Sequence, residues 1–233
     1  MSLSVRKRAK KGPKSLVKGK ATRDAVVARA LEIACKEGLA AITIGRLAKE
    51  LRMSKSGLFA HFRSKETLEL TTVEWAREIF EQHVLLPSGS VPEGLERLWK
   101  LCDSWLEHLE ERVFPGAYFF TGAFFVCAGQ RGAVSRSIVQ VMEEWMRALK
   151  QAVKQAQKNE EIDPEADTSW TAFEVNGLLL GAYWAHSMGK WWAWEDGRTT
   201  ILRKLQSLAT KEVPSKAFDS VGAFRKYLKK RSG

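Results

Sequence analysis

One stretch, residues 43–62, constrains the fold of this chain more than any other. Its first half places Ile44, Leu47 and Leu51 at helical spacing, so these side chains share one face of a short helix. A break at residues 52–54 follows, and a second short helix begins after it. Two helices joined by so tight a turn predict a helix-turn-helix, whose second helix fits the DNA major groove with its N-terminal residues against the base edges.

Hydroxyl side chains stand directly before three of the expected helices. Thr43, Ser54 and Ser64 can each accept a hydrogen bond from a backbone N–H of the following first turn. Glu66 is well placed beside the positive end of the helix that Ser64 begins. We therefore expect helices to start just after residues 43, 54 and 64.

These residues resemble the TetR family of bacterial transcriptional regulators. The resemblance rests on Leu58-Phe59-Ala60-His61-Phe62, on Ser64-Lys65-Glu66, and on a preceding helix over residues 26–37 closed by Gly38. It covers roughly residues 22–70, and beyond them only the length and an all-helical pattern agree. It implies a DNA-binding regulator whose C-terminal half commonly binds a small molecule that weakens operator binding.

Two residues depart from the family pattern. The family often has Gly where Arg52 stands in the turn, and a left-handed conformation there would cost about 1–2 kcal/mol in strain. The aromatic residue of the signature is usually Tyr, and Phe59 lacks the hydroxyl that reaches a phosphate. Stacking of its ring on a sugar or a thymine methyl is the contact that remains.

The helix starts and the resemblance together give the candidate DNA contacts. Thr43 and Lys65 sit at helix starts, where side chains and backbone amides can hold phosphates. His61 is expected to contact a phosphate as well. By the resemblance, Lys55 and Ser56 are the better candidates for reading bases. The full set is Thr43, Arg46, Ser54, Lys55, Ser56, Phe59, His61 and Lys65.

Charge separates the ends of the chain from its middle. The formal net charge is +11, and residues 1–65 carry 17 Lys and Arg against 4 Asp and Glu. Residues 66–200 carry 12 against 21, whereas residues 201–233 carry 9 against 2. This asymmetry is expected of a DNA-reading end joined to a different module.

Helical periodicity throughout predicts an all-α fold of about nine helices. Residues 1–20 hold eight basic residues and no acid, so we expect a disordered arm that is either a solvated tail or an arm along the DNA. A helix-turn-helix domain (21–66) and a ligand-binding and dimerisation domain (67–212) follow, then a basic C-terminal extension (213–233).

The aromatic side chains of the C-terminal half have two interpretations. They form the core, or they line an apolar ligand pocket, since such pockets combine aromatic walls with a few polar groups. The candidate pocket residues are Trp99, Trp105, Phe120, Phe124, Trp145, Phe173 and Asn176.

The helix expected over residues 165–189 is apolar nearly all round. Such a helix must be buried on every side, and a second subunit can cover the side that its own domain leaves open. In the TetR family this helix and the next one pair with their symmetry mates as a four-helix bundle. The candidate dimer-interface residues are Leu179, Tyr183, His186, Leu202 and Leu205.

No motif predicts a cofactor, a metal or catalysis. The histidines lack metal-ligand spacing, and no phosphate loop, nucleophile elbow or HExxH is present. Cys35, Cys102 and Cys127 are odd in number and far apart, so they are interpreted as reduced, packed thiols, with a redox-sensing thiol as the alternative. The uncharged stretch 113–130 is interrupted by Pro and Gly, which favours a short buried helix over a membrane span.

The sequence thus predicts a cytoplasmic, homodimeric, sequence-specific DNA-binding regulator. It is interpreted as a repressor released by a small apolar or aromatic effector, with operator DNA, that effector and a second copy as partners, and with no membrane and no cofactor. The basic N-terminus is not followed by an apolar run, so no signal peptide is visible. An architectural protein that coats DNA through its basic tails is the alternative, and a small-molecule enzyme is a remote one.

Overall fold

The computed structural model describes residues 13–111, 119–120, 122–123 and 131–232. Helix α1 (Pro13–Glu37) begins inside the segment that we expected to be a disordered arm. That expectation is therefore wrong for residues 13–20, where the backbone is helical, while residues 1–12 lie outside the described part of the chain.

The N-terminal domain contains α1, the short 3-10 turn η1 (Leu39–Ala41), α2 (Ile44–Glu50) and α3 (Lys55–Phe62). The hydroxyl of Thr43 accepts a hydrogen bond from the backbone N–H of Arg46 at 3.1 Å, and that of Ser54 accepts one from Gly57 at 3.0 Å. Leu58 and Phe62 are fully buried. The expected caps and helix-turn-helix are confirmed.

A long helical rod joins the two domains. It comprises α4 (Lys65–Phe80), a π-helical turn η2 (Glu81–Leu85) and α5 (Leu86–Gly89). Ser64 caps α4 by accepting a hydrogen bond from the N–H of Thr67 at 3.0 Å. Pro87 lies in the first turn of α5, where a proline's missing N–H is tolerated.

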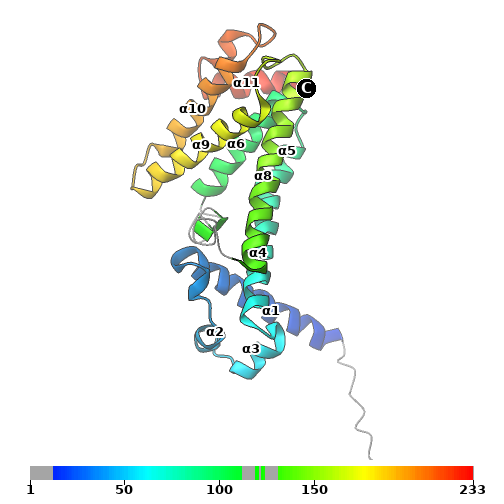
Figure 1. Ribbon diagram of the computed structural model, residues 1–233, viewed down its shortest axis with the longest axis vertical. Helices are drawn as coiled ribbons and strands as arrows, with labels where there is room; N and C mark the ends of the chain where they lie inside the picture. The colour runs from blue at the N-terminus through cyan, green and yellow to red at the C-terminus, as the bar shows by residue number, and fades with distance from the viewer. Residues whose placement is uncertain (1–12, 112–118, 121, 124–130, 233) are drawn as a thin grey trace, which may run out of the picture.

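The C-terminal domain is a helical bundle above the DNA-binding end (Figure 1). It contains α6 (Leu95–Glu110), α8 (Ala133–Lys158), α9 (Thr168–Ser187), α10 (Ala193–Leu208), the short turn η3 (Ser215–Phe218) and α11 (Val221–Ser232). Helix α8 packs against α4, α6 and α9, while α9 and α10 lie side by side along one edge of the molecule. The all-α class is confirmed, and one isolated bridge between Ile162 and Ala209 is the sole β feature of the described residues.

The basic C-terminal extension packs onto this bundle. Phe224 of α11 is fully buried, stacks on Phe218 with ring centroids 5.1 Å apart, and meets Trp99 of α6 edge-on at 5.2 Å. Arg225 donates to the buried Asp103 at 2.7 Å, and Arg231 pairs with Glu161. Two of its cations therefore stabilise the fold.

Candidate nucleic-acid interface and ligand pocket

The recognition helix α3 presents a shallow, exposed hollow shared with α2. Lys55, Ser56 and Phe59 line it, together with Ile44 and Gly45 from α2. The ring of Phe59 is 55% exposed, although large aromatic side chains usually seek the core. The expected base-reading residues are thus gathered on one open surface with an apolar group available for a methyl or sugar contact.

The candidate phosphate contacts lie at the edges of this surface. The ammonium of Lys65 donates to the carbonyl of Ala40 at 3.2 Å and lies 3.4 Å from a carboxylate oxygen of Glu69. An ammonium has three donors, and the Lys65 side chain is 47% exposed, so it retains donors for a phosphate. His61 is half-buried beside Phe62, with ring centroids 6.3 Å apart.

The guanidinium of Arg46, which we expected to contact DNA, is bound to carboxylates of the domain instead. Its terminal nitrogens donate to both carboxylate oxygens of Glu37, at 2.6 and 2.7 Å, and its Nε donates to Glu50 at 2.8 Å. These hydrogen bonds lower the pKa of Glu37 and Glu50. Arg29 also donates to Glu50, at 2.6 Å, so this cluster ties α1 to α2. The sequence did not reveal that Arg46 pairs with Glu37, because Glu37 lies on another helix.

The turn before the recognition helix has the geometry that the family pattern implied. Arg52 has a φ of 53°, which is the left-handed region that favours glycine. The N–H of the next residue, Met53, donates to the carbonyl of Ala48 at 2.8 Å and so closes the end of α2. Arg52 holds a strained conformation so that the chain can turn sharply into α3.

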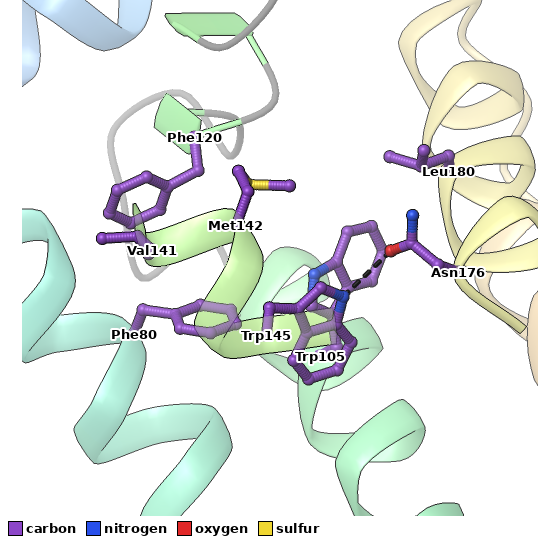
Figure 2. A pocket seen from close by; sticks show the side chains of 8 residues that line it. All are labelled: Phe80, Trp105, Phe120, Val141, Met142, Trp145, Asn176 and Leu180. Atoms are coloured by element: carbon purple, nitrogen blue, oxygen red, sulfur yellow. Dashed lines mark hydrogen bonds between the residues drawn. The ribbon is translucent and has the colours of Figure 1, made fainter. Parts of the chain in front are cut away.

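A cavity of about 30 Å³ lies between α4, α6, α8 and α9, as Figure 2 shows. Four of the candidate pocket residues, on α6, α8, α9 and the segment after α6, line it together. The lining comprises Phe80, Trp105, Phe120, Val141, Met142, Trp145, Asn176 and Leu180.

Aromatic rings form much of the wall of this cavity. Phe80 meets Phe120 and Trp145 edge-to-face, with ring centroids 6.0 and 5.7 Å apart. The indole N–H of Trp145 donates to Oδ1 of Asn176 at 2.9 Å, which joins α8 to α9 across the cavity. Among the described lining residues, Asn176 carries the one amide, in a lining that is otherwise mostly apolar.

Two pocket expectations, Trp99 and Phe173, are not met. Trp99 is buried against Phe224, away from the cavity, and Phe173 is 71% exposed on the outer side of α9. Phe124 lies outside the described residues. Phe80 and Leu180 were missed, because their helical periodicity marks them as apolar without revealing which helices they face.

A second, more open groove lies between α5, α6 and α8. Its volume is about 280 Å³, and it is lined by Leu101 and Ala148 together with charged and amide side chains such as Glu93, Arg97 and Gln155. Glu93 accepts hydrogen bonds from Arg97 at 3.0 Å and from Gln155 at 2.6 Å. Nε of Arg97 is buried and has no hydrogen-bond partner among the described residues.

The leucines expected at the dimer interface belong to the core of the protomer. Leu179 and Leu205 are fully buried and Leu202 nearly so, so their assignment to the interface is wrong. Tyr183 and His186 are half-buried, and the His186 ring stacks on Trp194 with centroids 4.3 Å apart.

Other residues of α9 form an exposed apolar face, which we call the α9 stripe. Its members follow one another at spacings of three and four, so they share one side of the helix. They are Trp170, Phe173, Gly177, Gly181 and Trp184. A Cβ added at either glycine would meet nothing within 4 Å, so the centre of the stripe is flat and open.

The described residues offer no support for metal, membrane or thiol chemistry. In them, no three His, Cys, Asp or Glu side chains could hold a metal, and no helix has the length and apolarity to cross a bilayer. Burial raises the pKa of the Cys35 thiol to about 12 and also raises that of Cys102, so neither favours the reactive thiolate. Cys127 lies outside the described residues.

Comparisons with known protein families agree with both halves of this architecture. Residues 26–70 match the model described as bacterial regulatory proteins, tetR family, and residues 94–190 match the tetracyclin repressor-like, C-terminal domain. No curated protein sequence matches the chain.

Solved structures share the fold at low sequence identity. A TetR transcriptional regulator from Chloroflexus aurantiacus J-10-FL is 21% identical, with a TM-score of 0.75 over 83% of this chain and 98% of that one. AibR in complex with isovaleryl coenzyme A and operator DNA is 23% identical, with a TM-score of 0.59 over 69% of this chain and 85% of that one. A protein of Saccharomonospora viridis in complex with choline is 16% identical, with a TM-score of 0.68 over 82% of this chain and 100% of that one.

With an N-terminal helix-turn-helix and a C-terminal domain that each match a model of the same family, the chain belongs to the TetR family of bacterial transcriptional regulators.

Proposed function

We propose that the protein is a cytoplasmic, homodimeric transcriptional repressor that a small apolar or aromatic molecule releases from its operator. The observation that carries this proposal is the position of Phe80. It is the last residue of α4, the helix that rises from the DNA-binding domain, and its ring forms part of the cavity wall. One helix therefore touches both sites.

The connection offers a direct route for release. Helix α4 packs against α1 and α3 at the DNA-binding end and against α8 in the C-terminal domain. A ligand that fits the cavity better in one position of Phe80 favours the matching position of α4, and so of α3. Such a ligand shifts the population away from the spacing of the two recognition helices that suits DNA. The size of the shift is set by the difference between the ligand's affinities for the two positions of α4.

Dimerisation through the α9 stripe is the second part of the proposal. Contiguous exposed apolar surface marks an interaction site, and the two glycines let a second helix approach closely. A two-fold axis at the stripe would place two recognition helices for successive major grooves, roughly 34–36 Å apart. A palindromic operator would match this symmetry.

On the DNA side, we assign base reading to Lys55 and Ser56 and phosphate contacts to Thr43, His61 and Lys65. Replacing Lys65 by Ala should weaken binding to all sequences alike and lower the salt slope by about one. Replacing Lys55 or Ser56 by Ala should instead change the preferred sequence. Operator affinity that is unaltered in all three variants would contradict the assignment.

The decisive experiment is to sequence the DNA fragments that the purified protein retains and to footprint them. A short protected palindrome supports the repressor, whereas uniform coverage supports an architectural protein. Against that rival, Arg225 and Arg231 of the basic extension already pair with acids of the fold. Turnover of a substrate by the pure protein would favour an enzyme instead.

The release step is tested with Phe80→Ala. This variant removes the side chain that links the cavity to α4, so we expect it to bind the operator while an effector of the wild-type protein no longer releases it. Normal release from the variant would show that α4 is not the route.

A further inference from the structure

We infer that the cavity selects a neutral, aromatic molecule with one carbonyl-type hydrogen-bond acceptor, which Nδ2 of Asn176 binds. This inference rests on the proposed function, in which the cavity is the effector site. It goes further by naming the chemical class of the effector and the atom that recognises it.

The lining is uncharged in the part of the chain that the structure describes. None of the eight residues around the cavity carries a formal charge. His108, whose ring meets Phe80 edge-on at 6.1 Å, adds none at neutral pH, because burial and the neighbouring His83 lower its pKa to about 4. An anionic or cationic ligand would lose its hydration here without gaining an opposite charge, so the site favours neutral molecules.

The hydrogen bond to Trp145 fixes the orientation of the Asn176 amide. An indole N–H can only donate, so the atom of Asn176 that lies 2.9 Å from it must be the oxygen. The amide nitrogen therefore points away from Trp145. In Figure 2 the amide nitrogen lies on the side of Asn176 that faces Leu180, across the cavity from Met142.

Among the described lining residues, this nitrogen is the hydrogen-bond donor that we assign to the ligand. The hydrogen bond from Trp145 is the one that Asn176 makes within the described part of the chain, and it uses the oxygen alone. Nδ2 is left as a donor of two N–H groups, which a carbonyl oxygen can accept and a hydrocarbon cannot. The site therefore distinguishes an acceptor-bearing ligand from its apolar analogue.

The shape of the cavity favours a flat ring system. Trp105, Trp145, Phe80 and Phe120 surround a cavity of about 30 Å³, so a ring that enters must displace one of these side chains, as the proposed release step does with Phe80. Aromatic side chains favour stacked or edge-on contacts with another ring. A molecule of one ring with a single carbonyl group meets both requirements.

Three matched probes test the inference: acetophenone, ethylbenzene and benzoate. Calorimetry on the full-length protein without DNA should show the ketone binding about tenfold more tightly than the hydrocarbon, since one extra hydrogen bond contributes about that factor. The anion should bind most weakly. Equal affinity for ketone and hydrocarbon, tightest binding of the anion, or no binding of any probe would overturn the inference.

The variant Asn176→Leu tests whether Nδ2 of Asn176 binds the carbonyl oxygen of the ligand. The variant loses the amide donor, so the ketone should lose its advantage while the hydrocarbon binds at least as tightly as to the wild-type protein. Retained hydrocarbon binding also shows that the variant folds and keeps its cavity. A ketone preference that survives in Asn176→Leu would overturn the role of Nδ2.

A matched pair of substitutions tests which of the two cavities binds the ligand. Leu180→Trp fills the cavity and should abolish ketone binding, whereas Ala148→Trp fills the groove between α5, α6 and α8 and should leave it unchanged. The opposite result would place the ligand in that groove and overturn the inference.

Because these measurements omit DNA, the two proposals fail separately. A ketone that binds as expected but leaves the operator complex intact would overturn effector release and keep the ligand class. An effector that releases the operator but has no acceptor would overturn the ligand class and keep the proposed function.

Discussion

At the scale of single residues, Arg52 shows how a sharp turn can be made at a cost in backbone strain. It is one of three non-glycine residues with positive φ in the described part of the chain, beside Arg63 and Glu160. Its position between α2 and α3 sets the angle at which the recognition helix leaves the domain. The strain is therefore tied to the geometry of DNA reading.

Replacing Arg52 with Gly should raise the free energy of unfolding by about 0.5–1 kcal/mol, because relief of strain exceeds the added entropy of the unfolded chain. Urea denaturation measures the change. Arg147→Gly is the matched control, since Arg147 is an exposed residue within α8 and its replacement should cost about 1 kcal/mol. A destabilised Arg52→Gly protein would contradict the assignment of strain.

His108 makes stability depend on pH. Burial and the nearby His83 lower its pKa from 6.5 to about 4. As the pH falls through this window, the unfolded chain binds a proton at His108 that the native protein does not, so stability falls. Glu37 and Glu50 have lowered pKa values, so they add acid sensitivity only below about pH 4.5.

The variant His108→Phe should therefore lose less stability than the wild-type protein between pH 7 and pH 5. The expected difference is about 2 kcal/mol, from the pKa shift at this position. Urea unfolding at the two pH values measures it. Identical losses for both proteins would show that His108 is protonated in the native state.

At the scale of helices, α11 is held to the bundle by a buried charge cluster. Asp103 of α6 is 5% exposed and accepts hydrogen bonds from Arg198 of α10 at 2.9 Å and from Arg225 of α11 at 2.7 Å. Arg198 donates to Glu110 at 2.8 Å as well. One carboxylate thus joins three helices.

Asp103→Ala should lower the free energy of unfolding by about 3–5 kcal/mol, because it leaves the buried Arg198 with a single, partly exposed partner. Thermal and urea unfolding report the loss. Glu107→Ala, on the same helix but half-buried, breaks only partly exposed ion pairs and should cost less than about 1 kcal/mol. Equal effects of the two substitutions would contradict the importance of the buried cluster.

At the scale of the whole molecule, we propose that two copies meet at the α9 stripe. Charged substitutions at Leu179 on α9 or at Leu205 on α10 would unfold the protomer, because both leucines lie in its core. Gly181 offers a cleaner test, since a Cβ there meets nothing within 4 Å and a larger side chain fits the isolated protomer.

Gly181→Arg should give a folded monomer that no longer binds the operator, because an isologous interface carries each substitution twice. Sedimentation measures the state of association, and circular dichroism checks the fold. Gly222→Arg on α11 is the control, where a Cβ would meet only a hydroxyl at 3.8 Å, and it should remain dimeric. A dimeric Gly181→Arg protein would place the interface elsewhere.

The sequence by itself determined the features that depend on neighbours within a turn or two of helix. The caps at Thr43, Ser54 and Ser64 and the tight turn after α2 follow from local hydrogen bonding and from φ preferences. The gathering of Lys55, Ser56 and Phe59 on one surface follows from the helical repeat of α3.

The tertiary structure alone decided which of several apolar or charged faces is used. Helix α9 is apolar nearly all round, so its period does not reveal that Leu179 faces inward while Trp184 faces out. Phe80 and Asn176 lie 96 positions apart in the sequence, and only the packing of α4, α8 and α9 brings them to one cavity. Arg46 likewise finds Glu37 through the contact of two helices. Contacts between distant segments depend on how helices pack, and a local pattern carries no record of that packing.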